Sequence, residues 1–234
     1  APILSIRWVL GRSAVDRPIY PRRGSDFSVS VQLTPPYSLW DGKDYKSTAL
    51  SEQERYNWIE FHKWMLKGQW FTPLTRNGNL VLMARAEMGY LGHYNKNKVS
   101  PFERFEVGGD GMTGYNMYGI DIISMRGYDD GALDPVGSNY SCAYNKYTME
   151  LRYPLLLKGQ TNIYVLGFLE GGNGFTSWKE FSPFKIKRSA GIGVRLFLPV
   201  VGMVGVDWGW GFDPAAGQTK RSGSHIHFTM GMQF

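Results

Sequence analysis

Two histidines near the end of the chain have a spacing that could support metal binding. His225 and His227 are two positions apart, so in a strand both rings would lie on one face, where they could ligate a metal ion. No third ligand lies close to them in the sequence, and polar side chains that face a wet interior explain the pair better. We therefore expect no metal site and no cofactor.

Carboxylates could supply the acid and base of a hydrolase. Glu87, Asp110 and Asp207 are the candidates, but the sequence alone cannot place them together. The Gly-x-Ser-x-Gly motif of serine hydrolases is absent, and Ser222-Gly223-Ser224 has the composition of a turn rather than of a phosphate-binding loop. The sequence identifies no catalytic residues, and we expect a protein that is not an enzyme.

A third candidate is the tripeptide Arg126-Gly127-Tyr128, within residues 93–143, a segment rich in Gly, Asp, Tyr and Asn. An arginine fork pairs bidentately with carboxylates and could tie a flexible loop to a protein wall. Glycine permits a close approach or a positive φ, and tyrosine can stack or form a hydrogen bond. A loop of roughly fifty residues is usually functional, although the tripeptide alone would also fit an ordinary surface turn.

The elements that would position these residues are β-strands. In the last ten residues, polar or small side chains at odd positions alternate with large apolar ones at even positions, namely His225, His227, Thr229, Gly231 and Gln233 against Ile226, Phe228, Met230, Met232 and Phe234. Ten residues is about the length that a tilted strand needs to cross a bilayer. The same reading predicts eight further strands, near residues 4–11, 27–34, 56–74, 80–91, 146–153, 162–170, 189–196 and 204–212.

The least regular of these segments is 56–74. Ser51 and Glu54, within the polar insertion 37–55, have the spacing of a helix capping box. The apolar pattern that follows fits neither a helix nor a strand cleanly. We expect a short helical turn there, followed by a long, irregular strand.

Composition excludes several classes of protein. No apolar run approaches the eighteen or so residues of a membrane helix, since the best candidate, residues 196–206, is broken by Pro199 and Gly202. Composition does not exclude a transmembrane β-barrel, because half of the side chains of barrel strands face a polar interior. The net charge is +6, but the Lys and Arg residues are scattered, so we expect no nucleic-acid partner. Cys142 is the single cysteine, which excludes an intrachain disulfide and a multi-cysteine metal site.

Aromatic residues and connection lengths favour a membrane barrel over a soluble sandwich. Aromatic side chains lie near the ends of the apolar faces, as in an interfacial girdle, namely Trp8, Tyr153, Trp208, Trp210 and Phe234. The connection at 199–202 is short while 93–143 is long, as in an outer-membrane barrel. The sequence thus predicts an all-β, antiparallel transmembrane β-barrel. A lectin-like or jelly-roll protein with a carbohydrate site is the alternative.

The long loop also carries a family resemblance. Its segments 101–110 and 125–128 resemble the loop that enters the barrel in the BamA family of outer-membrane assembly proteins and in its wider superfamily. That loop carries an Arg-Gly-aromatic tripeptide with a Gly-Gly segment upstream, here Gly108 and Gly109. Residues 16–24 resemble the Asp…Pro…Gly segment that leads into a strand of the family, and Phe234 resembles the aromatic end of its terminal β-signal. Sixteen residues separate Gly109 from Arg126, a longer gap than usual, which resembles versions from the Bacteroidetes lineage.

The resemblance implies a sixteen-stranded barrel preceded by periplasmic POTRA domains. With about nine strands, residues 1–234 look like the C-terminal portion of such a larger barrel. No signal peptide precedes Ala1 and the next residues already read as strand, so we expect the chain to begin within a structure. By family position, the partners of Arg126 would be Glu150 and Glu170 on the two strands after the loop. Strand parity independently places Glu150 on the polar face, whereas both faces around Glu170 are largely apolar.

The implied function is insertion and folding of β-barrel proteins in the bacterial outer membrane, where the protein would be integral. The last strand would form one side of an opening seam, through His225, His227, Thr229, Gly231, Gln233 and Phe234. The implied partners are outer-membrane lipids, nascent β-barrel client proteins and accessory BAM-type lipoproteins. The alternatives are a related polypeptide translocation pore, of the two-partner secretion or TamA-like kind, and a passive porin.

Overall fold

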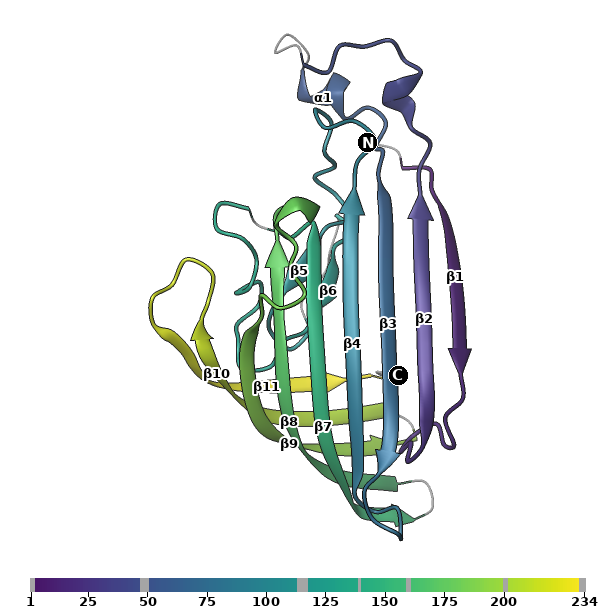
Figure 1. Cartoon of the computed structure of the whole chain (residues 1–234), viewed down its shortest axis with the longest axis vertical. Helices are drawn as coiled ribbons and strands as arrows, with labels where there is room; N and C mark the ends of the chain where they lie inside the picture. Colours follow the sequence, from purple (N-terminus) through teal and green to yellow (C-terminus); the bar gives the residue numbers. More distant parts are fainter. Residues whose placement is uncertain are drawn as a thin grey trace.

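The computed structural model describes residues 3–46, 51–112, 118–138, 140–158, 161–199 and 202–231. A single sheet of nine antiparallel strands dominates it, and its spatial order follows the chain. The strands are β1 (Ile6–Ser13), β2 (Gly24–Leu33), β3 (His62–Pro73), β4 (Val81–Gly92), β7 (Ala143–Lys158), β8 (Thr161–Phe175), β9 (Lys187–Leu198), β10 (Gly202–Pro214) and β11 (Arg221–Met230). The sheet curves strongly, so that β9–β11 run across the direction of β1–β4 (Figure 1). The predicted all-β, antiparallel class with about nine strands is confirmed.

The two faces of the sheet differ as the alternation of the sequence predicts. In β10, Asp207, Gly209 and Gly211 are buried on the inner face, while Val206 and Trp208 are exposed on the outer face. Four of the five aromatic side chains expected in a girdle are exposed, namely Trp8, Tyr153, Trp208 and Trp210. The fifth, Phe234, lies outside the described residues. An apolar exposed outer face over a polar inner face is the arrangement that a barrel wall in lipid requires.

In the part of the chain that the structure describes, no helix has both the length and the apolar character needed to cross a membrane.

The two longest connections lie at the same end of the sheet. They join β2 to β3 and β4 to β7, whereas the opposite end carries the shorter connections β1–β2, β3–β4, β7–β8 and β9–β10. The β4–β7 connection is folded rather than extended. Its short strands β5 (Phe105–Val107) and β6 (Asp121–Ile123) pair in parallel, and β5 lies against β7 and β8. A buried apolar core joins this connection to the sheet, made of Ile59, Phe61, Leu91, Phe105, Val107, Ile123, Met125, Tyr128, Leu133 and Tyr144.

Two local predictions were wrong. The strand expected to be irregular within 56–74 is β3, which pairs without a register shift to β2 and β4 because both neighbours complete its backbone hydrogen bonds. The segment 222–224, expected to be a turn, belongs to β11. Its backbone pairs with β10, and the Trp208 indole N–H donates to Ser224 Oγ at 2.8 Å.

The expected helical turn before β3 is α1 (Glu52–Arg55). It starts with the capping box that the spacing predicts, because Ser51 N–H donates to the Glu54 carboxylate at 3.1 Å and Glu54 N–H donates to Ser51 Oγ at 3.3 Å. Two short 3-10 helices, at Tyr37–Leu39 and Trp178–Glu180, lie in the connections of the same end of the sheet.

Candidate functional site

The candidate site lies where the folded β4–β7 connection meets the inner face of β7 and β8. Glu150 on β7 and Glu170 on β8 both point inward, and the register places Thr148 opposite Glu170 and Glu150 opposite Phe168. The two carboxylates are therefore diagonal neighbours on one face, within reach of a single long side chain. Each of the two glutamates is only 5% exposed.

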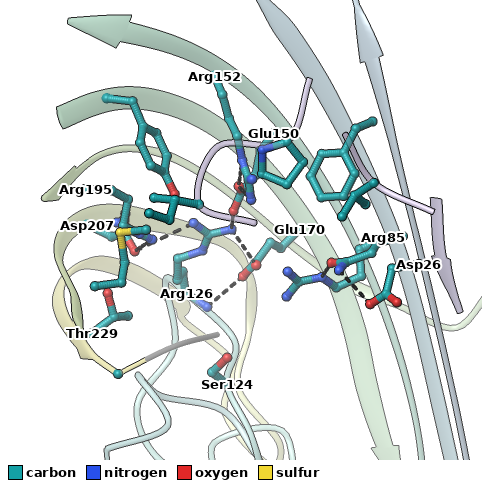
Figure 2. A pocket seen from close by; sticks show the side chains of 18 of the residues that line it. Asp26, Arg85, Ser124, Arg126, Glu150, Arg152, Glu170, Arg195, Asp207 and Thr229 are labelled. Carbon is teal, nitrogen blue, oxygen red and sulfur yellow. Dashed lines mark hydrogen bonds and ion pairs between the residues drawn. The ribbon is translucent and has the colours of Figure 1, made fainter. Parts of the chain in front are cut away.

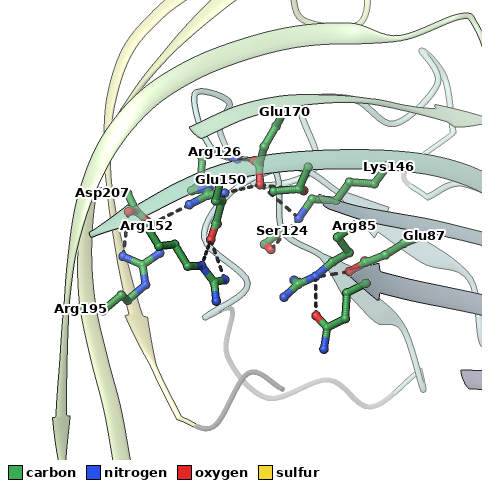
Figure 3. Close-up of polar contacts among 12 residues, drawn as sticks. Arg85, Glu87, Ser124, Arg126, Lys146, Glu150, Arg152, Glu170, Arg195 and Asp207 are labelled. Carbon is green, nitrogen blue, oxygen red and sulfur yellow. Dashed lines mark hydrogen bonds and ion pairs between the residues drawn. The ribbon is translucent and has the colours of Figure 1, made fainter. Parts of the chain in front are cut away.

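Arg126 joins these two carboxylates. Its Nη2 lies 2.7 Å from Glu150 Oε1 and 2.7 Å from Glu170 Oε1, and its backbone N–H donates to Glu170 Oε2 at 2.9 Å (Figures 2 and 3). The guanidinium carbon lies 3.7 Å from the centre of the Phe168 ring, a cation–π contact. The loop is thus tied to two adjacent strands by one side chain and one backbone amide.

Further charges extend this cluster along the inner face. Arg152 Nη2 lies 2.6 Å from Glu150 Oε2, and Lys146 Nζ lies 3.6 Å from Glu170 Oε1. Arg195 donates two hydrogen bonds to Asp207, at 2.7 and 2.6 Å, and Asp207 Oδ2 is 3.6 Å from Arg126 Nη1 (Figure 3). Sequence reasoning did not identify Lys146, Arg152 or Arg195 as part of the site, although inward parity on their strands was the available signal.

Two of the three carboxylates considered for hydrolysis, Glu87 and Asp207, are paired with cations. Asp207 contacts two arginines, and Glu87 lies 3.5 Å from Arg85. Asp110 lines the cavity described below. Burial alone would lower the pKa of Arg126, but the Glu170 and Glu150 carboxylates raise it, and the net shift is upward. Arg126 therefore stays charged, as an ion-pair network requires.

Glycines allow the loop to approach the wall. Gly127 has φ +86°, and a Cβ atom at this position would lie 2.9 Å from both the Gly211 nitrogen and the Ser189 Cβ. The wall has glycines of its own at the contact, because a Cβ on Gly209 would lie 2.8 Å from the Gly127 nitrogen. Side chains at either place would separate the loop from β10.

The upstream Gly-Gly segment lies beside the tripeptide. Met125 N–H donates to Gly109 O at 2.9 Å, and Gly109 N–H donates to Tyr128 O at 3.2 Å. A Cβ on Gly108, where φ is +136°, would lie 2.3 Å from the Asp129 carbonyl oxygen. Tyr128 is fully buried, and its hydroxyl donates to the Arg188 carbonyl at 2.9 Å. Gly108, Gly109 and the Arg-Gly-Tyr tripeptide therefore form one packed unit.

The last strand also contacts this unit. His227 Nε2 accepts a hydrogen bond from Gly127 N–H at 2.8 Å, and His225 Nδ1 lies 3.2 Å from Asp129 Oδ1. Thr229 and Gly231 line the cavity near Arg126, whereas Gln233 and Phe234 lie outside the described residues. Across the described ranges, no group of three or more His, Cys, Asp and Glu side chains is placed to hold a metal ion.

A cavity of about 240 Å³ lies between the loop and the wall (Figure 2). Its lining holds equal numbers of acidic and basic side chains, namely Asp26, Asp110, Glu150, Glu170 and Asp207 with Arg85, Arg126, Lys146, Arg152 and Arg195. The β1–β2 connection closes part of it through Val15, Pro18, Ile19 and Pro21. Such a balanced lining suits a hydrated interior whose charges neutralise one another.

Comparisons with known proteins agree with this architecture. The Omp85 superfamily domain matches residues 3–234. The outer membrane protein assembly factor BamA of Neisseria meningitidis serogroup B is 26% identical over 143 residues, which cover 61% of this chain and 13% of that protein. The crystal structure of BamA from Haemophilus ducreyi lacking POTRA domains 1-3 matches with a TM-score of 0.64 and 18% identity, over 96% of this chain and 41% of that chain. The chain therefore spans less than half the length of these relatives, and the expected resemblance is confirmed.

Proposed function

The chain belongs to the Omp85 superfamily, and we propose that it is the C-terminal part of a barrel that inserts and folds other β-barrel proteins in the bacterial outer membrane. Its relatives are integral outer-membrane β-barrels, and the outer face of β11 fits that location, since Ile226, Phe228 and Met230 are 57–66% exposed. The activity would form and break no covalent bond. Its partners would be outer-membrane lipids, nascent β-barrel clients and accessory BAM-type lipoproteins.

The observation that supports the proposal is the hydrogen-bonding pattern of β11, one of the two outermost strands of the sheet. This strand is the last of the sheet and pairs with β10 alone among the described residues. Gly231 N–H donates to Met203 O at 2.9 Å, and hydrogen-bonded pairs alternate with non-bonded pairs in an antiparallel ladder. Odd-numbered residues of β11 therefore bond to β10, and the backbone groups of Ile226, Phe228 and Met230 point to the free edge. An incoming client strand could pair with these groups.

Two features support opening at this edge rather than elsewhere. The Arg126 cluster and the buried core of the loop join β7 and β8 to the loop, which stiffens the middle of the sheet. Just after β11, Gly231 adopts φ +113°, a backbone conformation that side chains rarely allow. β11 is joined to the loop by two histidine contacts rather than by the Arg126 ion pairs. We propose that residues 93–143 act as the internal brace of this barrel portion.

The proposal is tested by removing one edge donor without disturbing the ladder to β10. Phe228→Pro deletes an N–H that faces the free edge, and proline is tolerated at such positions. Phe228→Ala is the matched control, because it removes the same side chain and keeps the N–H. In liposomes that contain the full natural protein, the rate of client insertion is measured by protease protection of the folded client. We expect Phe228→Pro to be about fivefold slower than Phe228→Ala, for one lost hydrogen bond of about 1 kcal/mol. Equal rates for the two variants would contradict strand pairing at this edge.

A translocation pore of the two-partner secretion or TamA-like kind is the second candidate. The charged cavity favours it, because a hydrated interior suits passage of a polypeptide. In that case export of the secreted polypeptide would not depend on the β11 edge. Normal export by Phe228→Pro, together with no client insertion by the wild-type protein, would select the pore.

A further inference from the structure

Two histidines of β11 contact the loop that carries Arg126, Gly127 and Tyr128. His227 is 5% exposed, and its Nε2 accepts the Gly127 N–H at 2.8 Å across 100 residues of sequence. His225 Nδ1 lies 3.2 Å from the Asp129 carboxylate. The two rings are nearly parallel, with centroids 6.0 Å apart. Gly127 and Asp129, two positions apart in the loop, therefore both contact β11 through imidazole groups.

The two imidazoles have opposite proton requirements. His227 accepts a hydrogen bond at Nε2, so this nitrogen must carry no proton. His225 lies between two acceptors, because its Nε2 is 3.1 Å from the Ser222 carbonyl oxygen and its Nδ1 faces Asp129. A proton on either nitrogen of His225 would have a hydrogen-bond acceptor. A proton on Nε2 of His227 would face the Gly127 N–H and break the contact.

Charged groups around His227 come from every element packed against it. Asp207 lies directly opposite on β10. Asp110 of the loop and Glu170 of β8 also influence the ring, as does His225 on the same strand. Arg126, the neighbour of Gly127, is 3.6 Å from Asp207. Burial of the ring opposes a proton on His227, as do the His225 ring and the Arg126 cation, whereas the three acidic groups favour it.

We propose that His227 is a positioning residue that docks the Arg-Gly-Tyr loop on the last described strand, and that protonation of His227 releases this contact. The loop is then held to β11 at neutral pH and freed from it in acid, while the Arg126 ion pairs keep it on β7 and β8. The protonated fraction of an imidazole rises as the pH falls, so the contact is lost in acid and not in base. The consequence for strand opening rests on the proposed function; the contact itself does not.

Hydrogen–deuterium exchange of the Gly127 amide tests the proposal on the full natural protein in detergent. Exchange is followed by mass spectrometry on peptides that cover residues 123–131, at pH 5.5 and 7.5, and is corrected for the intrinsic rate at each pH. His227→Gln keeps a side-chain acceptor and does not titrate, whereas His227→Phe has no acceptor. His225→Gln is the matched control, because it removes the neighbouring histidine and leaves His227 in place.

We expect protection of Gly127 in the wild type to be lower at pH 5.5 than at pH 7.5, because a larger fraction of the His227 imidazole is protonated at the lower pH. His227→Gln should stay protected at both pH values, His227→Phe should be unprotected at both, and His225→Gln should keep the wild-type fall. A His227→Gln variant with the wild-type fall, or a His227→Phe variant that is as protected as the wild type at pH 7.5, would overturn the proposal. The measurement does not involve client insertion, so its failure is separate from failure of the proposed function.

Discussion

Replacing Arg126 by methionine should release the loop from the wall without unfolding the sheet. The arginine is 6% exposed, and its Nη2 bridges two carboxylates at 2.7 Å each. Loss of one partner from a buried ion pair costs about 3–5 kcal/mol. Arg152 stays 2.6 Å from Glu150 and Lys146 stays 3.6 Å from Glu170. Because these cations still compensate the carboxylates, we place the cost near the lower limit, at about 3 kcal/mol.

This cost falls on loop docking, because the sheet keeps all of its backbone ladders. A loss of about 3 kcal/mol raises the released fraction of the loop more than a hundredfold. Limited proteolysis within residues 118–138 measures that fraction on the full natural protein, and the heat-modifiable gel mobility of the barrel reports the sheet. Arg188→Gln is the matched control, since the Arg188 side chain is 64% exposed and its ion pair with Asp213 is at the surface.

The expected result is rapid cleavage of the loop in Arg126→Met, slow cleavage in Arg188→Gln and in the wild type, and unchanged heat-modifiable mobility in all three. Equal cleavage rates for Arg126→Met and the wild type would refute the reasoning, because they would show that the buried core of the loop holds it in place without the ion pairs. Loss of the folded mobility in Arg126→Met would instead show that the cost falls on the sheet.

Two further substitutions test the loop separately. Gly127→Ala should weaken docking of the loop by about 2 kcal/mol, because Gly127 has a positive φ and close contacts with the wall. Gly137 has φ +79° and no atom within 4 Å of an added Cβ, so Gly137→Ala should increase cleavage of the loop far less. Equal cleavage of the two variants would show that backbone strain alone is responsible. Burial raises the pKa of Asp134 from 3.8 to about 7, so its stabilising contribution is complete below pH 3.8 and is lost as the pH rises through 7. In a His227→Gln background, protection of the loop amides from hydrogen exchange should therefore fall from pH 5 to pH 8. Adding Asp134→Asn should abolish this fall. The same pH dependence with and without Asp134→Asn would disprove the expectation.

The strands of the sheet could be predicted from the sequence because their cause is local. A side-chain period of two follows from strand geometry alone, so the alternation around Asp207 or His227 already separates the buried face from the exposed one. The capping box at Ser51 and Glu54 is local for the same reason, since its two partners are three residues apart.

The regularity of β3 and the start of β11 could not be predicted in this way. Both depend on a neighbouring strand that supplies backbone partners from elsewhere in the chain, and β3 receives them on both edges. At the start of β11, Gly223 pairs with Gly211, so a segment with turn composition becomes strand. Tertiary pairing overrides the local preference of such residues.

The sequence by itself determined which side chains face inward, and through the family pattern it placed Arg126 near Glu150 and Glu170. Only the tertiary structure decided how those inward charges combine. Glu170 lies on a strand with little alternation, and Arg195 and Asp207 enter the cluster through the register of β9 and β10. The contact of Gly127 with His227 spans 100 residues. Ion pairs and hydrogen bonds of this kind need atoms within about 3 Å, and curvature of the sheet together with strand register, which no local pattern encodes, brings them there.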